Sequence, residues 1–245
     1  MPDTSPDHAD PLARLATLEG VGSAMAATRD GIDALLRDRG LRRTTPETTG
    51  ESLLRGAHAS AVLEGADASL EVTREGGGDE TVQAAVRVST ELLGLAPTLV
   101  SAPLQAIARV HTLAGKGVCA DDDLGRPRDE QSAARLRDLA RLLAADTAAP
   151  ALVVAAVVHA ELATVAPFVS HNGIVARALE RLLLVARGVD AKSLTVPEAG
   201  HLALRREYES NLRGYRDGGP AGVQSWLLYA AEAYAAGAEA SPLRG

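Results

Sequence analysis

Between two apolar segments of this chain lies the stretch Ala166-Pro167-Phe168-Val169-Ser170-His171-Asn172-Gly173-Ile174-Val175-Ala176-Arg177. Residues 149–165, which precede the loop, are apolar nearly all round, and this is typical of a buried central helix. Residues 172–188 place apolar side chains at helical spacing and end at Gly188, a natural helix C-cap. The sequence therefore predicts a helix–loop–helix unit over 149–188 at the centre of the fold.

This loop has the properties of an anion site. A loop that enters a helix presents free backbone N–H groups and the positive end of the helix dipole, and such a place favours a phosphate. Asn172 and Gly173 tolerate positive φ and let the backbone approach a ligand. By itself the pattern is a weak signal, because many helices begin in this way and bind nothing.

The rest of the chain also has helical periodicity, with little of the alternation typical of strands. The sequence predicts an all-α bundle, with a disordered tail over 1–10 and one domain over 11–240. Thr45 and Pro46 are a good helix start, and Gly65 is a good helix end. Residues 116–128 are expected to form a surface loop. Further helices are predicted at 11–39, 46–65, 80–93, 102–115, 130–145, 198–216 and 220–236. Gly20 and Gly22 are candidate interruptions of the first of these helices.

Composition narrows the function classes. The formal net charge of −7 argues against a nucleic-acid partner, because general nucleic-acid binders have a basic balance. The longest apolar run, over 149–158, is too short to span a bilayer, and the N-terminus does not resemble a signal peptide, so we expect a cytoplasmic protein without a membrane partner. Cys119 is the single cysteine, which leaves no internal disulfide and no thiolate metal cluster.

The central stretch resembles the signature loop of the Fic (Fido) family, H-P-F-x-[D/E]-G-N-G-R-x-x-R. The frame of that motif is kept at Pro167, Phe168, Asn172, Gly173 and Arg177. The resemblance implies a Fic-like helical bundle. In Fic proteins the loop holds a nucleotide diphosphate with a divalent metal, and a histidine acts as general base while AMP is transferred to a hydroxyl group of a target protein.

A second motif strengthens the resemblance. Ser60-Ala61-Val62-Leu63-Glu64-Gly65 is similar to the inhibitory pattern [S/T]-x-x-x-E-[G/N] of self-inhibited Fic proteins. There the glutamate reaches the second signature arginine, so the resemblance pairs Glu64 with Arg177 and gives Ser60, Glu64 and Gly65 an inhibitory role. The Glu64–Arg177 pair has two interpretations, a retained regulatory contact and a purely structural ion pair, and the sequence does not decide between them. His159, in a segment similar to the family's "HAE", is expected to be a satisfied core histidine.

The reactive groups of the motif are missing. Ala166 stands where the family has its histidine, Ser170 where it has the metal-binding acid, His171 where it has a glycine, and Ile174 where it has an arginine. A general base, a hard metal ligand and a guanidinium fork are the groups that this reaction needs. We therefore expect that AMP transfer is lost and that Mg²⁺ does not bind. The sequence assigns no cofactor with certainty, and a nucleotide is the candidate ligand.

These residues leave three functions open. The leading hypothesis is a pseudoenzyme that binds a small phosphate-type ligand or a protein partner. The candidate ligand-binding residues are Ser170, His171, Asn172, Gly173 and Arg177. The alternative is an active nucleotidyl or phosphoryl transferase with altered chemistry, in which His171 is the catalytic base. The third is a helical interaction module that forms a homodimer through its alanine-rich helices.

Overall fold

The computed structural model describes residues 10–37 and 44–244, and in these ranges the regular elements are all helical. The predicted all-α class is confirmed. Most of the predicted tail, and residues 38 and 39 of the first predicted helix, lie outside the described residues. The helices are α1 (Pro11–Ala16), α2 (Val21–Leu35), α4 (Pro46–Leu63), α5 (Leu70–Arg74), α6 (Glu80–Leu92), α7 (Ala96–Ser101), α8 (Pro103–Gly115), α9 (Glu130–Ala144), α10 (Ala151–Val165), α11 (Asn172–Ala186), α12 (Pro197–Ala203), α13 (Arg205–Asp217) and α14 (Gly219–Glu239).

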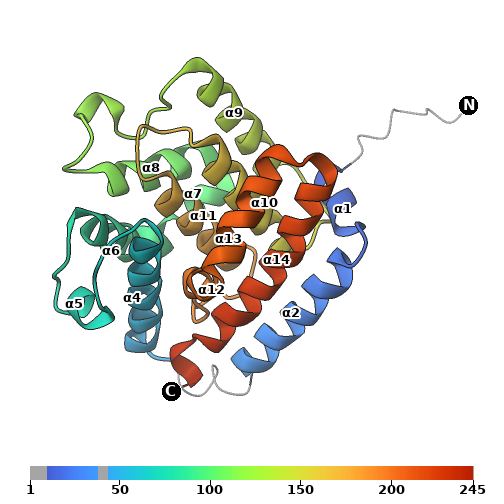
Figure 1. The fold of residues 1–245 in the computed structure, drawn as a ribbon, viewed down its shortest axis with the longest axis horizontal. Helices are drawn as coiled ribbons and strands as arrows, with labels where there is room; N and C mark the ends of the chain where they lie inside the picture. The colour runs from blue at the N-terminus through green and yellow to red at the C-terminus, as the bar shows by residue number, and fades with distance from the viewer. Residues whose placement is uncertain (1–9, 38–43, 245) are drawn as a thin grey trace, which may run out of the picture.

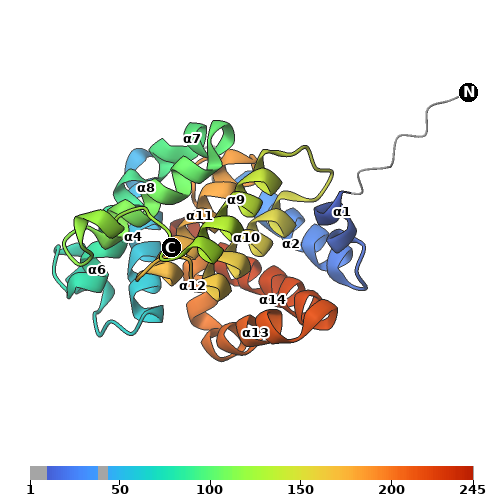
Figure 2. The ribbon, with the colours of Figure 1, turned by 90° about the horizontal axis from the view of Figure 1, so that it is seen from above.

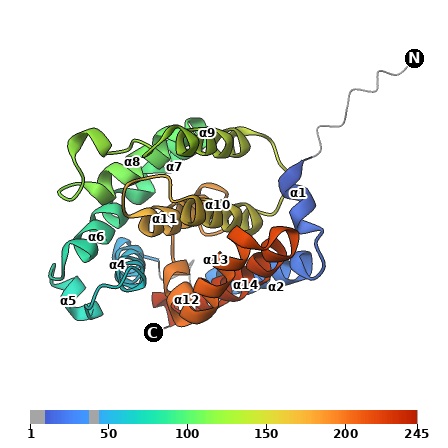
Figure 3. The same cartoon turned by 45° about the horizontal axis from the view of Figure 1, so that its top comes forward.

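Helices α10 and α11 form the middle of three layers. Figure 3 shows α7, α8 and α9 on one side of this pair, and α4, α12, α13, α14 and α2 on the other. In the views of Figures 1 and 2, the antiparallel pair α13 and α14 covers α10 and α12 from one side. Buried side chains occur nearly all round α10, as its sequence predicts, because helices cover it on both sides. The loop between α10 and α11 therefore leaves from this central pair, with Phe168 buried and Val169 exposed.

Polar caps define several of the helix starts. The Thr45 hydroxyl accepts a hydrogen bond from the Thr48 N–H, and Pro46 occupies the first turn of α4. Asp79 caps α6 and Asp129 caps α9 in the same way. The helix predicted over 46–65 ends at Leu63, after which Gly65 takes φ of +99° and lets the chain turn away.

Two predicted helices are split in the structure, and two short helices were not predicted. The helix predicted over 11–39 is broken before α2 at Gly20, whose φ is +77°. Residues 96–101 form the separate short helix α7 ahead of α8, where a turn was expected, and α5 was not predicted. The single helix predicted over 198–216 is wrong, because the backbone leaves the α-helical region at Leu204 (φ −111°, ψ 38°) between α12 and α13.

Close packing on α14 gives a physical reason for that break. A Cβ added to Gly200 of α12 would lie 2.0 Å from the carbonyl oxygen of Ala233, so the two backbones touch. The Val196 N–H also donates to the Gly237 carbonyl, at 2.9 Å. Because α12 is held against the C-terminal half of α14, the chain must change direction before α13 can pack along the same helix.

Aromatic side chains of α13 and α14 contribute to the core. Trp226 is fully buried, and its indole N–H donates to the carbonyl of Ala156 at 2.8 Å. Tyr208 and Tyr229 are also buried. Within the described ranges, no helix combines the length and the apolarity that a membrane span needs.

Candidate functional site

Two residues with left-handed backbone shape the loop between α10 and α11. Ala166 follows α10 with φ of +46°, and its N–H donates to the carbonyl of Leu162 at 3.1 Å. His171 precedes α11 with φ of +57°. Left-handed backbone is uncommon for residues that carry a Cβ, so the loop needs contacts that hold it in place.

Asn172 supplies those contacts. Its side-chain oxygen accepts from the N–H of Phe168 and its amide nitrogen donates to the carbonyl of Phe168, both at 2.9 Å. Phe168 is buried and stacks face to face on His111 of α8, with ring centroids 4.0 Å apart. Asn172 and Phe168 therefore act as a clamp that holds the loop in its conformation.

The 116–128 segment packs on the same clamp. The Gly125 N–H donates to His111 Nδ1 at 3.0 Å, and the Arg128 N–H donates to the carbonyl of Pro167 at 2.9 Å. Burial of the imidazole, with His171 nearby, lowers the pKa of His111 to about 4. The segment was expected to be a surface loop, and much of it is exposed, but it also seals one side of the signature loop.

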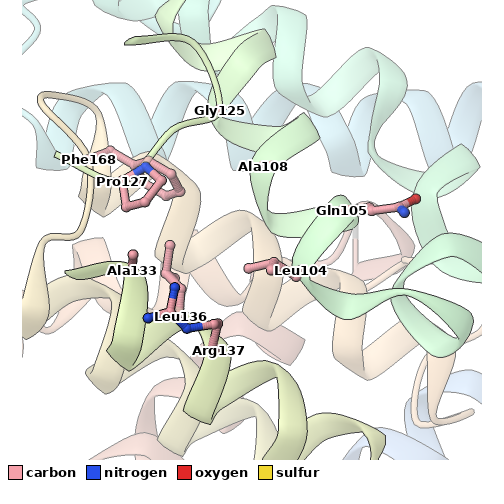
Figure 4. A pocket seen from close by; sticks show the side chains of 9 residues that line it. All are labelled: Leu104, Gln105, Ala108, Gly125, Pro127, Ala133, Leu136, Arg137 and Phe168. Carbon is pink, nitrogen blue, oxygen red and sulfur yellow. The ribbon is translucent and has the colours of Figure 1, made fainter. Parts of the chain in front are cut away.

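An apolar cavity of about 310 Å³ opens beside this segment, between α8 and α9. Figure 4 shows Pro127 close to Phe168, and Leu104 of α8 directed toward Leu136 and Arg137 of α9. The cavity has few polar groups, and Phe168 is the one residue of the signature loop that lines it.

The N-terminus of α11 faces the end of α4. Arg177 is 1% exposed, and its Nη2 lies 2.7 Å from Glu64 Oε1. The same guanidinium donates to the Ser60 hydroxyl at 2.9 Å, the Ser60 carbonyl at 3.1 Å and the Tyr208 hydroxyl at 3.1 Å. Burial alone would lower the pKa of Arg177, but Tyr208 and Glu64 outweigh it and raise that pKa. Arg177 is therefore a permanent buried cation.

The Glu64 carboxylate also lies over the backbone of Gly173. A Cβ added at Gly173 would be 2.1 Å from Glu64 Oε1, so a larger residue could not occupy this position without moving the carboxylate. Glu64 is the C-cap of α4, and Gly65 turns the chain immediately after it. An internal carboxylate thus stands at a helix N-terminus, where backbone N–H groups favour negative charge. Ser60, Glu64, Gly173 and Arg177 meet here, whereas the Asn172 side chain is bonded to Phe168.

The substituted positions form a different environment. Ile174 is buried in the hydrophobic core. The Ser170 hydroxyl lies 2.6 Å from His171 Nδ1 and 3.0 Å from Cys119 Sγ, so it is already engaged within the protein. Burial lowers the pKa of His171, although Glu64 acts in the opposite direction. His171 is therefore mainly neutral at pH 7 and chemically able to accept a proton.

A second polar cluster lies behind Arg177, and the sequence did not predict it. His159 of α10, Glu180 of α11 and His201 of α12 meet there, each 0% exposed. Burial alone would raise the pKa of Glu180, but the two imidazoles overcome this and lower it, so the carboxylate is ionised. His159 is only partly the satisfied core histidine that was expected. Its Nε2 lies 3.0 Å from the Tyr208 hydroxyl, but its Nδ1 has no hydrogen-bond partner.

A further buried ion pair was also missed. Arg181 Nη2 lies 2.6 Å from Glu198 Oε2, and Arg181 also donates to the hydroxyls of Ser52 and Ser193. Gly56 of α4 makes room for it, since a Cβ there would lie 2.6 Å from Arg181 Nη2. This pair fixes α4 against α11 and α12, and so helps to place Glu64.

Comparisons with known proteins identify the fold. No family model matches this sequence, and a search of the curated proteins gives no match. Among solved structures, a Fic family protein from Desulfovibrio desulfuricans G20 matches with a TM-score of 0.74 at 18% identity, over 91% of this chain and 74% of that one. A fragment of Fic-1 from C. elegans matches with a TM-score of 0.69 at 18% identity, over 90% of this chain and 71% of that one. A point variant of the same C. elegans fragment matches with a TM-score of 0.61. The chain therefore has the fold of the Fic family proteins.

Proposed function

We propose that this chain is a Fic-like pseudoenzyme that has lost AMP transfer and acts by binding. The ligand is a small phosphate-bearing molecule, for which a nucleotide is the candidate, held at the N-terminus of α11 by the backbone around Asn172 and Gly173 and by Arg177. Glu64 competes with it for the same place. A protein partner that offers a carboxylate or phosphate to this terminus is the alternative form of the proposal.

The observation that carries the proposal is the position of the Glu64 carboxylate. It lies against Gly173 and on the buried Arg177 guanidinium, where an external anion would combine the helix dipole with a fixed cation. Glu64 is 30% exposed, so its carboxylate can swing toward solvent, whereas Arg177 cannot follow it. Displacing Glu64 leaves a permanent cation that needs a new anion.

The loss of catalysis rests on three positions. Ala166 has no group that can take a proton, and Ile174 is turned into the core. Ser170 offers a neutral hydroxyl already bonded to His171, which is a poor ligand for Mg²⁺. Removing one stabilising group commonly costs about 100- to 1000-fold in rate, so the loss of three removes the ordinary reaction.

Calorimetric titration of pyrophosphate, ADP and ATP, without added metal, tests the binding claim. We expect weak binding to the natural chain and at least about tenfold tighter binding to Glu64→Gly, because the internal carboxylate no longer competes. Glu75→Gly is the matched control, since it removes an exposed carboxylate at the end of α5 and should leave affinity unchanged. If none of these compounds binds a folded Glu64→Gly protein, the phosphate form of the proposal fails.

A transfer assay with labelled ATP and Mg²⁺ tests the loss of catalysis. We expect no label on the protein or on added proteins for either the natural chain or Glu64→Gly. Label that appears, and that increases in Glu64→Gly, would contradict the pseudoenzyme proposal.

One contact favours a second candidate function. Ser170 Oγ lies 2.6 Å from His171 Nδ1, which is the distance of a hydroxyl paired with a base. In this alternative His171 acts as the base of a transferase with altered chemistry. Any turnover found should then be abolished in His171→Ala, and turnover that persists unchanged in that variant excludes the role.

A homodimer formed through the alanine-rich helices stays a proposal. Most of the alanines of α10 and many of those in α14 are buried within the chain itself, so a second copy would need another surface. Sedimentation analysis of the purified protein distinguishes a monomer from a dimer.

A further inference from the structure

The buried cluster behind Arg177 brings together three groups that commonly bind metals. His159 Nδ1 lies 3.0 Å from Glu180 Oε1, and His201 Nε2 lies 2.9 Å from Glu180 Oε2. All three ligand atoms lie within 4.8 Å of one another, and each side chain is fully buried on a different helix. A carboxylate that is completely removed from water requires strong partners.

Hydrogen bonding accounts for only part of this arrangement. His201 and the Tyr234 hydroxyl each donate to one oxygen of Glu180, at 2.9 and 2.8 Å. His159 Nδ1 is close enough to Glu180 Oε1 for a bond but is not directed at it, and this buried nitrogen has no hydrogen-bond partner. His159 Nδ1 and Glu180 Oε1 are thus placed like two metal ligands, which lie close together because both are directed at the ion between them.

The surrounding hydroxyl groups suit such a centre. The other ring nitrogen of His159 lies 3.0 Å from the Tyr208 hydroxyl, and the other ring nitrogen of His201 lies 2.8 Å from the Tyr229 hydroxyl. Tyr234 holds the carboxylate. Each group therefore has an outer partner that fixes its orientation, and outer partners of this kind typically accompany metal-ligating histidines.

The geometry points to a structural metal site in which His159, Glu180 and His201 bind one divalent transition-metal ion of the zinc class. Two imidazoles and one carboxylate match the nitrogen and oxygen ligands that zinc accepts. At bond lengths of about 2.1 Å, tetrahedral ligands lie about 3.4 Å apart, so each histidine–glutamate separation needs to open by about 0.4 Å. A water molecule or the Tyr234 hydroxyl completes the fourth position. The ion would join α10, α11 and α12 directly behind the signature loop.

Charge does not oppose this assignment. The cluster carries one ionised carboxylate and two imidazoles that bind a metal in their neutral form. Arg177 reaches the cluster through the Tyr208 hydroxyl and is itself paired with Glu64. None of the proposed phosphate-binding residues is a proposed metal ligand, so the metal content can be measured without a phosphate ligand.

The test is the metal content of tag-free protein. The protein is unfolded and refolded with Zn²⁺ or Co²⁺ and then dialysed, because a buried site exchanges slowly. Elemental analysis should give about one ion per chain, and Co²⁺ should give the visible absorption bands of tetrahedral coordination. His201→Asn and Glu180→Gln should each lower the metal content at least about tenfold. His111→Gln, which changes a buried histidine outside the cluster, should keep it.

Two results would overturn the assignment. One is less than about 0.1 ion per chain, with no cobalt bands, in protein that is folded by circular dichroism. The cluster would then be a hydrogen-bonded network without metal. The other is metal that remains bound in folded His201→Asn protein. The cobalt spectrum of the natural chain is decisive even if the variants fail to fold.

Discussion

Replacing Gly173 by alanine should break the contact between Glu64 and Arg177 without touching either side chain. The added Cβ would lie 2.1 Å from Glu64 Oε1 and 3.1 Å from Arg177 Nη1. Glu64, at the end of α4, is the more exposed partner and should be the one to move. Arg177 then keeps its bonds to Ser60 and Tyr208 but loses its counter-charge.

The cost can be bounded from these contacts. Removing one partner of a fully buried pair costs about 3–5 kcal/mol, and the 30% exposure of Glu64 together with the remaining bonds of Arg177 reduces this to about 2 kcal/mol. For a chain of this size that corresponds to a fall of about 4–8 °C in the melting temperature. In the Glu64→Gly background only the 3.1 Å contact with Arg177 Nη1 remains, so Gly173→Ala should have an effect within about 0.5 kcal/mol, because the helix propensity of alanine offsets that contact.

A double-mutant cycle measured by urea unfolding checks this reasoning. The natural chain, Gly173→Ala, Glu64→Gly and the double variant should give a coupling free energy of about 2 kcal/mol between the two positions. If Gly173→Ala destabilises both backgrounds equally, within about 0.5 kcal/mol, the carboxylate does not occupy the helix terminus and the argument for competition at this site is refuted.

Three further predictions concern the supports of the site. Burial lowers the pKa of His111 in the folded chain to about 4, from an ordinary value of about 6.5, so the unfolded chain binds more protons between these values. The free energy of unfolding should therefore fall by up to about 3 kcal/mol from pH 7 to pH 4, and in His111→Gln it should depend less steeply on pH. Asn172→Ala leaves the N–H and the carbonyl of Phe168 without their partner, and it should lower the free energy of unfolding by about 2 kcal/mol. If the urea midpoint of the variant equals that of the natural chain, Asn172 does not act as a clamp. Gly222→Ala puts a Cβ 1.9 Å from a backbone oxygen of α13, and this overpacking should cost about 1–3 kcal/mol of stability and lower the melting temperature by several degrees. Gly50→Ala in α4 is the control, because its Cβ would meet open space and the melting temperature should not fall.

Strong local signals made much of the fold predictable from the sequence. The start of α4 is marked by Thr45 and Pro46, and its end by Gly65, and these residues act locally. The break at Leu204 was missed because the apolar spacing of Leu204 and Tyr208 continues through it. Its cause is the contact of Gly200 with α14, which joins residues far apart in the sequence.

The candidate site also has one part that could be predicted from the sequence and one part that could not. The Glu64–Arg177 pairing follows from two motifs that the sequence carries, so its partners could be named in advance. The Glu180 cluster could not, because its members lie on three helices and Glu180 has the sequence context of a charged residue on an amphipathic helix. The one available signal was His159 in an apolar segment, since a buried imidazole needs a polar partner. Nothing local indicated which residue that partner would be.

A crystal structure of Glu64→Gly soaked with ADP tests most directly whether the N-terminus of α11 binds an external anion in place of Glu64. We predict phosphate density against the backbone of Gly173 and within hydrogen-bond distance of Arg177, with no metal ion bound at Ser170. A well-ordered helix terminus that stays empty in crystals soaked with millimolar ADP, in a lattice that leaves the loop open, would contradict the proposal.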